Sequence, residues 1–535
     1  MYSARHRLLL SLLSGVLFFL AWYPMPATPF IFIAFVPLLM VQADLQLHQK
    51  KGFFKYAFIT LLFWNVSVTF WVVNSTLVGG IAAFILNSLL QYLPLLVYNH
   101  IKRKTNFWYG MFAFVSGWLV FEKLHLTWEL SWPWLTLGNV FANRPDWIQW
   151  YEYTGHLGGS FWVLLVNVFA FYFIDKFSSI DVRRNSLFML VPALVALLLP
   201  FGVSYIVGKA AEKTITQGTT SEVVVVQPNI DPYDEKFDYA TVPFQMSNLI
   251  KLTKRQVTEN TDFIVWPETA IPTPTWIESL YEPTYMQTVK NFIDSTNNAT
   301  LVTGITLLDY YDEPKTSTAR AAGDGYYDVY NAALMLRKNT NFEIYKKSKL
   351  VPGVERMPYP GFFKFLGPLS INLGGMVGSH GTQDTRGVFS NSSGHKIAPV
   401  ICYESVYGEF VTDYMKAGAE AFFIVTNDAW WGETPGYLQH CQYATLRSIE
   451  TRKWCARSAN TGISCFIDPM GNLIKSTSYW EPNTIKHTIY LNKIQTIYTR
   501  YGDSWVFIFA IVLILLFSIT FINRNKNEQL LHEEE

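Results

Sequence analysis

Long runs of apolar residues fill most of the chain up to about residue 207, and one more run lies near the C-terminus. A transmembrane helix needs about 20 mostly apolar residues, with a usual range of about 17–25. Eight runs come close to this length, so we predict eight transmembrane helices rather than buried helices of a soluble protein. The predicted helices cover residues 8–22, 30–45, 53–73, 77–97, 107–121, 158–174, 187–207 and 504–522.

Lysine and arginine in the short loops between these runs predict the orientation of the bundle. Cytoplasmic loops carry the excess of positive charge in membrane proteins. Nearly all basic loop residues of this chain fall on one side, and the other side carries only Lys123 and Arg144. We therefore predict that both termini are cytoplasmic, that the long segment between the last two helices lies outside, and that the first run is a retained anchor. The residues on the predicted cytoplasmic side are Arg5, Arg7, Lys50, Lys51, Lys55, Lys102, Arg103, Lys104, Lys176, Arg183, Arg184, Arg524 and Lys526.

The loop between the fifth and sixth predicted helices is rich in tryptophan. Tryptophan favours the membrane–water interface because its ring is amphipathic. The loop therefore has two interpretations, an interfacial belt or a half-buried wall beside a lipid-binding site. Its tryptophans are Trp128, Trp132, Trp134, Trp147 and Trp150.

Residues 208–503 have a different pattern, in which short apolar runs alternate with amphipathic stretches. Strands that alternate with helices predict a layered α/β domain around one core. We divide the chain into a seven-helix transmembrane bundle (1–207), an extramembrane α/β domain (208–503), and an eighth helix with a cytoplasmic tail (504–535). Strands are expected at 222–227, 262–266, 299–307, 331–336, 342–345, 396–402, 420–426, 462–467 and 488–491, and helices at 242–258, 275–295, 405–417 and 437–456.

Composition agrees with two unlike parts, since 50% of the 535 residues are hydrophobic and only 16% are charged. A soluble domain has about 25% charged residues. A net charge of +1 provides no field that would attract nucleic acid. Four cysteines are too few for a disulfide scaffold, and no spacing typical of metal ligands is present. For Cys441, Cys455 and Cys465 we expect small buried residues, with a disulfide as the alternative.

Three reactive side chains come directly after predicted strands of the α/β domain: Glu268, Lys347 and Cys402. Sites in open α/β sheets assemble beyond the carboxyl ends of strands, so these residues can meet at one rim. A thiolate is a nucleophile, a carboxylate can take its proton, and a lysine can face the oxyanion of an acyl-transfer intermediate. Their order alone is weak support, because a solvated Glu, a solvated Lys and an inert buried Cys would fit it equally well.

The local strings around these residues resemble the nitrilase superfamily, which carries Glu, Lys and Cys in this order. A second set of strings resembles one branch of it, the apolipoprotein N-acyltransferase family of Gram-negative inner membranes, and eight spans before and after an outer domain match that family too. The first strings are Trp-Pro-Glu-Thr-Ala at 266–270, Tyr-Lys-Lys-Ser-Lys-Leu-Val-Pro at 345–352 and Ile-Cys-Tyr-Glu at 401–404; the second are Thr-Asn-Asp-Ala-Trp-Trp-Gly at 426–432, Gln-His at 439–440 and Arg-Ser-Ala-Asn-Thr-Gly at 457–462.

The resemblance implies an αββα sandwich for the outer domain and a role for each matched residue. It makes Glu268 the general base, Lys347 the oxyanion-stabilising lysine and Cys402 the nucleophile. Glu355 matches a second essential glutamate, whose local alternative is an ion pair with Arg356.

Two further residues, Tyr403 and Glu404, match supporting or substrate-binding positions beside the nucleophile. Their local alternatives are packing for Tyr403 and a carboxylate at a helix N-terminus for Glu404.

The sequence departs from the family pattern at three places. Lys349 stands where the family commonly has His, which leaves Lys346 and Lys349 as alternatives to Lys347, although alignment on Leu-Val-Pro favours Lys347. Residues 353–354 are Gly-Val where the family commonly has Phe-Gly, and Phe237 replaces a tryptophan of a mobile arm. The last two departures concern substrate contacts rather than the chemistry.

The implied activity is a two-step acyl transfer in lipoprotein maturation. A phospholipid gives an acyl chain to Cys402 as a thioester, and the α-amine of the N-terminal diacylglyceryl-cysteine of an apolipoprotein then accepts it. No cofactor or metal is implied, and the partners are the two lipids and the bilayer. The alternatives are a membrane-tethered amidase or nitrilase acting on soluble amides, and a transporter or receptor with a degenerate hydrolase-like domain.

Two further expectations concern access to the site. The glycine-rich segment at 361–378 is expected to form a mobile lid, with an ordinary surface loop as the alternative. The site itself is expected to open toward the bundle, because drawing an acyl chain into water costs about 0.8 kcal/mol per CH₂.

Overall fold

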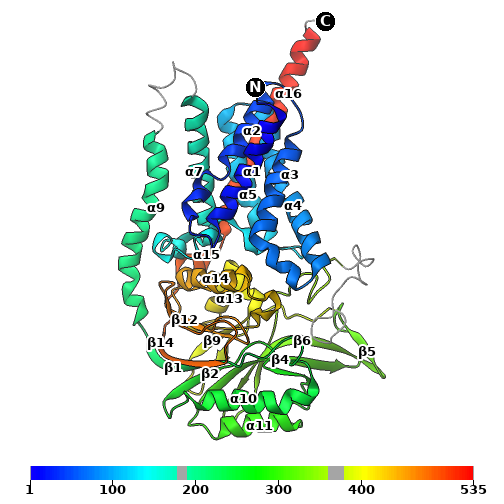
Figure 1. Ribbon diagram of the computed structural model, residues 1–535, viewed down its shortest axis with the longest axis vertical. Helices are drawn as coiled ribbons and strands as arrows, with labels where there is room; N and C mark the ends of the chain where they lie inside the picture. Colours follow the sequence, from blue (N-terminus) through cyan, green and yellow to red (C-terminus); the bar gives the residue numbers. More distant parts are fainter. Residues whose placement is uncertain (1, 178–189, 360–378, 534–535) are drawn as a thin grey trace. The chain divides into compact units, whose positions relative to one another are not determined.

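The structure, a computed structural model, describes residues 2–177, 190–359 and 379–533 (Figure 1). The chain forms two compact units. One unit is helical and consists of Met1–Phe70, Gly80–Val207 and Tyr501–Glu535. The other contains both sheets and consists of Gly208–Arg500 together with the short segment Trp71–Gly79. Nothing in the hydrophobic pattern indicated that residues 71–79 belong with the α/β domain.

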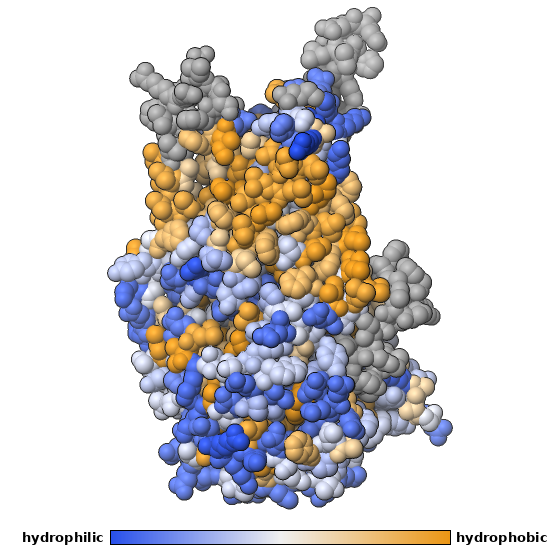
Figure 2. Space-filling model, in the orientation of Figure 1, coloured by the Kyte–Doolittle hydropathy of each residue, from blue (hydrophilic) through white to orange (hydrophobic). Residues whose placement is uncertain are grey.

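Seven of the eight predicted spans coincide with helices that are long and apolar enough to cross a membrane, counting only the described residues. Figure 2 shows a broad hydrophobic band over these helices, as expected for a surface that faces lipid. Their bounds are α1 Ala4–Ala21, η1 Thr28–Ile33 with α2 Val36–Leu47, α3 Phe53–Thr69 with η2 Phe70–Asn74, α4 Leu77–Lys104, α7 His156–Phe177, α9 Leu190–Ala211 and α16 Phe507–Glu533.

The remaining predicted span coincides with α5 (Phe107–His125), which is 19 residues long but is not one of those seven helices. Its last turn contains Glu122, Lys123 and His125, which lower its apolar character. Most of its inner face is buried against other helices of the unit. A count of eight spanning helices is therefore approximate.

The tryptophan-rich loop is folded into short helices, and most of its tryptophans are half-buried. Trp134 is buried, and the Trp147 ring packs edge-on against Phe201 with centroids 5.0 Å apart. These contacts make the loop part of the interior of the helical unit. The short helices are η3 Pro133–Leu135, η4 Leu137–Phe141, η5 Pro145–Trp147 and α6 Tyr151–Thr154.

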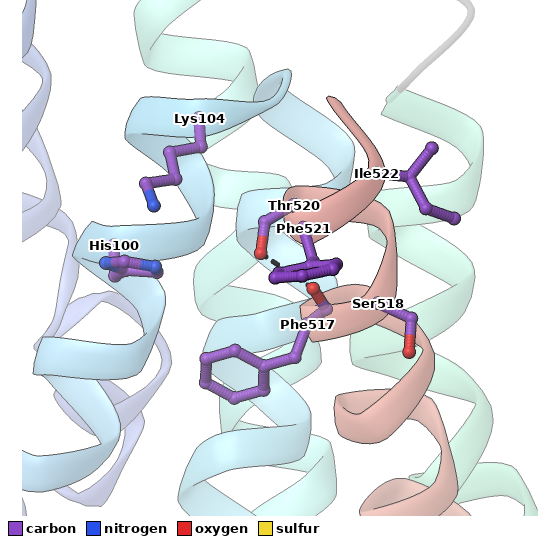
Figure 3. Close-up of a pocket in the computed structure, with 7 residues that line it drawn as sticks. All are labelled: His100, Lys104, Phe517, Ser518, Thr520, Phe521 and Ile522. Carbon is purple, nitrogen blue, oxygen red and sulfur yellow. Dashed lines mark hydrogen bonds between the residues drawn. The ribbon is translucent and has the colours of Figure 1, made fainter. Parts of the chain in front are cut away.

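A pocket of about 510 Å³ lies between α4 and α16 in the helical unit (Figure 3). The two helices contribute unlike walls, with His100 and Lys104 from α4 and phenylalanine rings from α16. Its lining, among the described residues, includes neither a thiol nor a carboxylate, so it lacks the Glu and Cys of the predicted catalytic set. The residues from α16 are Phe517, Ser518, Thr520, Phe521 and Ile522.

The second unit contains two sheets. The eight-stranded sheet has the order β14-β1-β2-β4-β6-β5, with β3 beside β4 and β7 beside β6, and the six-stranded sheet has the order β13-β12-β11-β10-β9-β8. The central strands β1, β2 and β4 are parallel, as are β9, β10 and β11. The strands are β1 Thr219–Gln227, β2 Thr261–Val265, β3 Ile271–Trp276, β4 Thr300–Tyr311, β5 Arg320–Ala322, β6 Gly325–Leu336, β7 Glu343–Lys346, β8 Phe389–Ser390, β9 Lys396–Ile401, β10 Ala421–Thr426, β11 Cys455–Ala459, β12 Cys465–Ile467, β13 Leu473–Ser476 and β14 Asn483–Leu491.

The two sheets pack face to face, and helices cover both outer faces (Figure 1). Between the sheets, Phe263 of β2 meets Phe423 of β10 edge-on at 5.1 Å. The helices α10 (Val242–Lys254) and α11 (Thr284–Asp294) cover the first sheet with apolar side chains, and α13 (Gly408–Lys416) and α14 (Pro435–Thr451) cover the second. This is the αββα sandwich that the resemblance implied.

Two predicted helices are shorter than expected. The helix predicted at 437–456 ends at Thr451, where Arg452 takes a left-handed conformation, and Cys455–Ala459 forms the central strand β11 instead. The pattern of β11 looked helical because the strand is buried on both faces and shows no alternation. The helix predicted at 275–295 begins only at Thr284, after Pro283, and its first residues extend strand β3.

All four cysteines are buried and none is in a disulfide. The Cys441 and Cys465 sulfur atoms lie 3.8 Å apart, and Cys455 lies in β11 rather than in a helix. The expected glycine-rich lid at 361–378 and the basic residues Arg183 and Arg184 lie outside the described residues.

Candidate active site

Glu268 lies in the turn that follows β2. Glu268 is only 6% exposed although the turn lies at the end of a strand. The next residue, Thr269, has a φ of 46°, and a Cβ at Gly304 of β4 would come within 2.5 Å of the Glu268 Cα. Gly304 therefore allows the turn to pack directly on the sheet. The buried Lys236 Nζ donates a hydrogen bond to the Glu268 carbonyl oxygen at 2.9 Å, which holds the turn from the other side.

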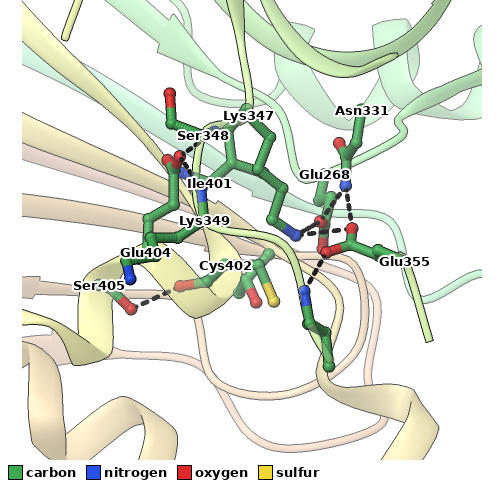
Figure 4. Close-up of polar contacts among 12 residues, drawn as sticks. Glu268, Asn331, Lys347, Ser348, Lys349, Glu355, Ile401, Cys402, Glu404 and Ser405 are labelled. Atoms are coloured by element: carbon green, nitrogen blue, oxygen red, sulfur yellow. Dashed lines mark hydrogen bonds and ion pairs between the residues drawn. The ribbon is translucent and has the colours of Figure 1, made fainter. Parts of the chain in front are cut away.

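Lys347 follows β7 and is 1% exposed. Its Nζ lies 3.1 Å from Glu268 Oε1 and 2.8 Å from Glu355 Oε1 (Figure 4). Burial lowers the pKa of Lys347, but the charges of Glu268 and Glu355 outweigh burial and raise it well above its ordinary value. The ammonium group is therefore a fixed cation, suited to stabilising negative charge and unsuited to accepting a proton.

The two neighbouring lysines are held elsewhere, so Lys347 alone of the three reaches the two glutamates. Lys346 Nζ pairs with Asp309 at 2.6 Å. Lys349 Nζ lies over the Tyr407 ring, 4.7 Å from its centroid, and burial lowers its pKa to about 8. The structure thus places the lysine favoured by the Leu-Val-Pro alignment beside Glu268.

Glu355 pairs with Lys347 at 2.8 Å, whereas the local alternative expected a pair with Arg356. Its second oxygen accepts a hydrogen bond from the Val351 N–H at 2.8 Å. Burial raises the pKa of Glu355, but the Lys347 and His380 charges and the hydrogen bonds from Lys347 and Val351 together lower it. Gly353, which departs from the family pattern, has a φ of 78° and forms the tight turn that brings Glu355 back toward the lysine.

Asn331 is a site residue that the sequence analysis missed. It lies in β6, and its Nδ2 donates to Glu268 Oε1 and to Glu355 Oε1, both at 2.8 Å (Figure 4). Its backbone carbonyl also accepts from the Lys347 N–H at 2.8 Å. Asn331 therefore fixes both carboxylates and the lysine backbone. A polar residue in a largely apolar strand carried no signal that could have revealed this.

Cys402 is the first residue of η11 (Cys402–Val406), immediately after β9, and is 8% exposed. Its φ of 47° lies in the left-handed region, which costs a residue with a side chain on the order of 1–3 kcal/mol. Burial and the Glu268 charge raise the pKa of the thiol, while Lys347 and a hydrogen bond with Thr426 act against them without reversing the shift. A raised pKa means that the resting group is a neutral thiol, which needs a base to become a nucleophile.

Glu404 is fully buried and connects the lysine loop with the nucleophile turn. Its Oε1 accepts from the Ser348 N–H and the Tyr345 hydroxyl, both at 2.7 Å, and its Oε2 accepts from the Ile401 N–H at 2.9 Å. This arrangement matches the local alternative of a carboxylate at a helix N-terminus. We interpret Glu404 as a positioning residue.

Tyr403 is also buried, and its ring packs edge-on against Tyr407 at 5.1 Å. That contact agrees with the packing interpretation. Phe237, in the place of the arm tryptophan, stacks on Trp430 with centroids 6.5 Å apart.

Among the described residues, no group of three or more His, Cys, Asp and Glu side chains is arranged to hold a metal ion. The site therefore consists of a neutral thiol, a permanent cation and two carboxylates, all shielded from water. Such a set can carry out nucleophilic acyl transfer with its own side chains.

An αββα sandwich with Glu, Lys and Cys at strand ends defines the carbon–nitrogen hydrolase class, and the family model described as carbon-nitrogen hydrolase matches residues 222–499. A second family model, described as apolipoprotein N-acyltransferase N-terminal domain, matches residues 14–169. With the relatives described next, these matches show that the chain belongs to the apolipoprotein N-acyltransferase family, a multi-pass membrane branch of the nitrilase superfamily.

Curated relatives that carry the name apolipoprotein N-acyltransferase cover most of the chain. The protein from Chlorobaculum tepidum is 31% identical over 503 residues, which is 92% of each chain. The protein from Rickettsia prowazekii is 30% identical and covers 78% of this chain and 76% of its own. A solved structure of a mutant amidase from Nesterenkonia, of the nitrilase superfamily, is 12% identical with a TM-score of 0.37 and covers 55% of this chain and 97% of its own.

Proposed function

We propose that this protein moves an acyl chain from a phospholipid, through a thioester on Cys402, to the α-amine of the N-terminal diacylglyceryl-cysteine of an apolipoprotein. Membership of the family supports an acyltransferase of lipoprotein maturation. The observation that carries the mechanism is the buried cluster in which Lys347 contacts Glu268 and Glu355 beside a neutral thiol.

In the first step, Glu268 accepts the thiol proton as the Cys402 sulfur attacks the ester carbonyl carbon of the phospholipid. A C–S bond forms, and the developing oxyanion faces the Lys347 ammonium. When the tetrahedral intermediate collapses, the C–O bond breaks and the lysophospholipid leaves with the proton from Glu268. A permanent cation at Lys347 suits this role because its charge does not depend on the proton transfer.

In the second step, the neutral α-amine of the acceptor attacks the thioester carbonyl carbon. A C–N bond forms and the C–S bond breaks, which gives an amide and the thiolate. Glu268 takes a proton from the attacking amine and returns it to the sulfur, so the enzyme ends in its starting state. Glu355 and Asn331 keep Lys347 and Glu268 in place through both steps.

The helical unit gives this chemistry a membrane setting. Moving the acyl chains of either lipid out of the bilayer would cost about 0.8 kcal/mol of free energy per CH₂. We therefore expect the reaction to take place at the bilayer surface. We place the catalytic domain on the outer face of the inner membrane of a Gram-negative bacterium, with both termini in the cytoplasm. That the site opens laterally toward the bundle stays a prediction.

The experiment that tests this proposal uses purified full-length protein and phospholipid labelled in one acyl chain. We expect a labelled acyl-protein that hydroxylamine releases, because hydroxylamine cleaves thioesters, and we expect none from Cys402→Ala. A diacylglyceryl peptide with a free α-amine should then take the label.

Two results would contradict the proposal. One is label on Cys402→Ala at the wild-type level. The other is turnover of soluble amides without acylation by phospholipid, which would favour the membrane-tethered amidase.

A further inference from the structure

A buried polar cluster lies directly behind the nucleophile and has no part in the mechanism above. Its three members come from separate elements: Asp428 from η12 (Asp428–Trp431), His440 from α14 and Arg457 from β11. All three side chains are fully buried. Arg457 NH2 lies 2.6 Å from Asp428 Oδ2, and His440 Nδ1 lies 2.9 Å from Asp428 Oδ1.

The cluster reaches the nucleophile through its backbone carbonyl. His440 Nε2 lies 3.2 Å from the Cys402 carbonyl oxygen, which can only accept, so Nε2 carries a hydrogen. The Ser405 hydroxyl donates to the same oxygen at 2.7 Å and lies 3.1 Å from Nε2. Two donors thus hold one carbonyl group, and the residue that owns it is the left-handed Cys402.

A left-handed backbone is unfavourable for any residue with a Cβ, and it persists only where the surroundings hold it. The direction of the Cys402 side chain depends on that backbone. If the carbonyl were released, the turn would relax and the sulfur would move away from Glu268 and Lys347. Small displacements of a reacting atom are enough to lower a rate by about a hundredfold.

We propose that Arg457, Asp428 and His440 act as a positioning network for Cys402 in the acyl transfer proposed above, on which this inference rests. Arg457 pairs with Asp428, both contact Nδ1 of the His440 ring, and Nε2 of the same ring holds the Cys402 carbonyl. Burial raises the pKa of Asp428, but Arg457 and His440 outweigh it and hold the pKa at about 2, so the carboxylate anchor is permanent.

Asp428 also affects the Cys402 thiol directly, and this effect makes the thiol less reactive, whereas positioning makes it more reactive. The Thr426 hydroxyl donates to Asp428 Oδ1 at 2.9 Å and hydrogen-bonds the Cys402 thiol. The Asp428 charge raises the pKa of the thiol. A carboxylate that mattered only through its charge would therefore slow the enzyme, and its removal would help. A carboxylate that positions His440 would do the reverse.

The charged groups that face the thiol come from four segments. Lys347 follows β7 and opposes the rise in the thiol pKa, while Glu268 after β2 and Asp428 after β10 favour it. Lys236, before α10, is attracted by the thiolate. Because His440 contacts the carbonyl rather than the sulfur, we expect its loss to act on all these interactions together, through the position of the thiol.

The test compares His440→Leu with His440→Gln in the full-length protein. Leucine cannot donate, whereas the glutamine amide can still donate to the Cys402 carbonyl. We expect acyl-enzyme formation from labelled phospholipid to slow about a hundredfold in His440→Leu and less than about tenfold in His440→Gln. His395→Gln is the matched control, since His395 pairs with Glu420 outside the site, and it should leave the rate unchanged.

A second measurement needs no lipid. The pH dependence of Cys402 alkylation by iodoacetamide, with Cys402→Ala as the blank, should show a lower midpoint in His440→Leu than in wild type, because the sulfur moves away from Glu268, whose charge raises the thiol pKa by more than Lys347 lowers it. A mere loss of folding stability would not move this midpoint. For Asp428→Asn we expect a lower midpoint together with slower acyl-enzyme formation.

The outcomes separate the two proposals. If wild type forms no acyl-enzyme, the proposed function fails, and the alkylation profiles alone decide on the network. Equal rates or equal alkylation midpoints in His440→Leu and wild type overturn the network, as does an equal loss in His440→Leu and His440→Gln. If Asp428→Asn does not fold because Arg457 loses its partner, the two His440 variants decide.

Discussion

The two units of the molecule bury polar groups in different ways. In the helical unit, the buried charged side chains, such as Arg7 paired with Asp44, lie near helix ends. Within the bundle, neutral side chains form a chain of hydrogen bonds: Asn87 donates to Asn65 at 2.6 Å, and Asn65 donates to Gln91 at 2.8 Å. In the catalytic unit, the candidate site buries ions, with Lys347 beside Glu268 and Glu355. Hydrogen bonds between neutral amides stabilise helix packing where burying a charge in lipid would cost much free energy. Buried ions in the catalytic unit stabilise the charge that develops during the reaction. Substitutions in the helical interior should therefore act mainly on stability, and substitutions at the buried ions should act mainly on catalysis.

The largest effect is expected from Lys347→Met. Two buried carboxylates would lose their cation, and breaking a buried ion pair costs about 3–5 kcal/mol. We expect no detectable acyl-enzyme and a clearly lower thermal unfolding temperature. Lys346→Met is the control, because that lysine is partly exposed in its pair with Asp309. Similar losses in both variants would show that the buried ions have no special role.

Glu268→Gln should come next. The amide keeps the size of the side chain and can still contact Lys347, but it cannot take the thiol proton. We expect acyl-enzyme formation to slow by about 10²–10⁴-fold, as for a lost general base. Single-turnover rates with labelled phospholipid measure this, with the exposed Glu259→Gln as control. A change confined to the apparent lipid affinity would assign Glu268 to binding instead.

Lys236→Met should have a smaller effect on rate and a distinct effect on pH dependence. Burial lowers the pKa of Lys236 to about 7, against the pull of Glu268 and Cys402. An unfolded lysine has a pKa of about 10.4, so between about pH 7 and 10 the unfolded state binds more protons and this residue makes stability rise with pH. The variant should lose that part of the slope in thermal unfolding. An unchanged pH dependence of the unfolding temperature would mean that the pKa of Lys236 is not lowered in the folded protein.

Asn87→Leu should have the smallest effect on activity. It removes the amide that donates to Asn65 and accepts from His125 Nε2 at 2.9 Å. Hydrogen bonds between membrane helices contribute about 0.6 kcal/mol on average and at most about 1.7. We expect a modest fall in the unfolding temperature, with acyl-enzyme formation per folded molecule unchanged. A strong loss of rate at unchanged stability would contradict the division between the two interiors.

The sequence could predict the parts of the site that lie at strand ends. Glu268, Lys347 and Cys402 each follow an apolar run, and such runs identify strands well. It could not assign roles to Asn331 and Lys236, because one polar residue in a strand or loop looks like any other until the chain is folded. Asp428, His440 and Arg457 lie in recognisable strings, yet only the fold brings three such distant segments together.

The sequence also predicted the main features of the fold. The alternation of strands and helices indicated the layered domain, and the apolar runs indicated the bundle. The strand β11 was missed because both of its faces are buried, which removes the alternation that marks a strand. The start of α11 was misplaced because Pro283, rather than the apolar pattern, sets its first turn.

The segment Trp71–Gly79 limits how this protein can be divided into separately expressed domains. Although it includes the end of one apolar span and the start of the next, it belongs to the catalytic unit. Asn74 donates to the Trp431 carbonyl at 2.8 Å, and the Trp71 ring packs edge-on against Trp431 at 4.8 Å. A gene fragment for residues 208–500 would omit this segment and expose Trp431. The Trp431 ring in turn packs against the His440 ring, with centroids 5.4 Å apart. The catalytic domain thus cannot be expressed intact as the single fragment 208–500. A version without the membrane helices would need residues 71–79 fused to it.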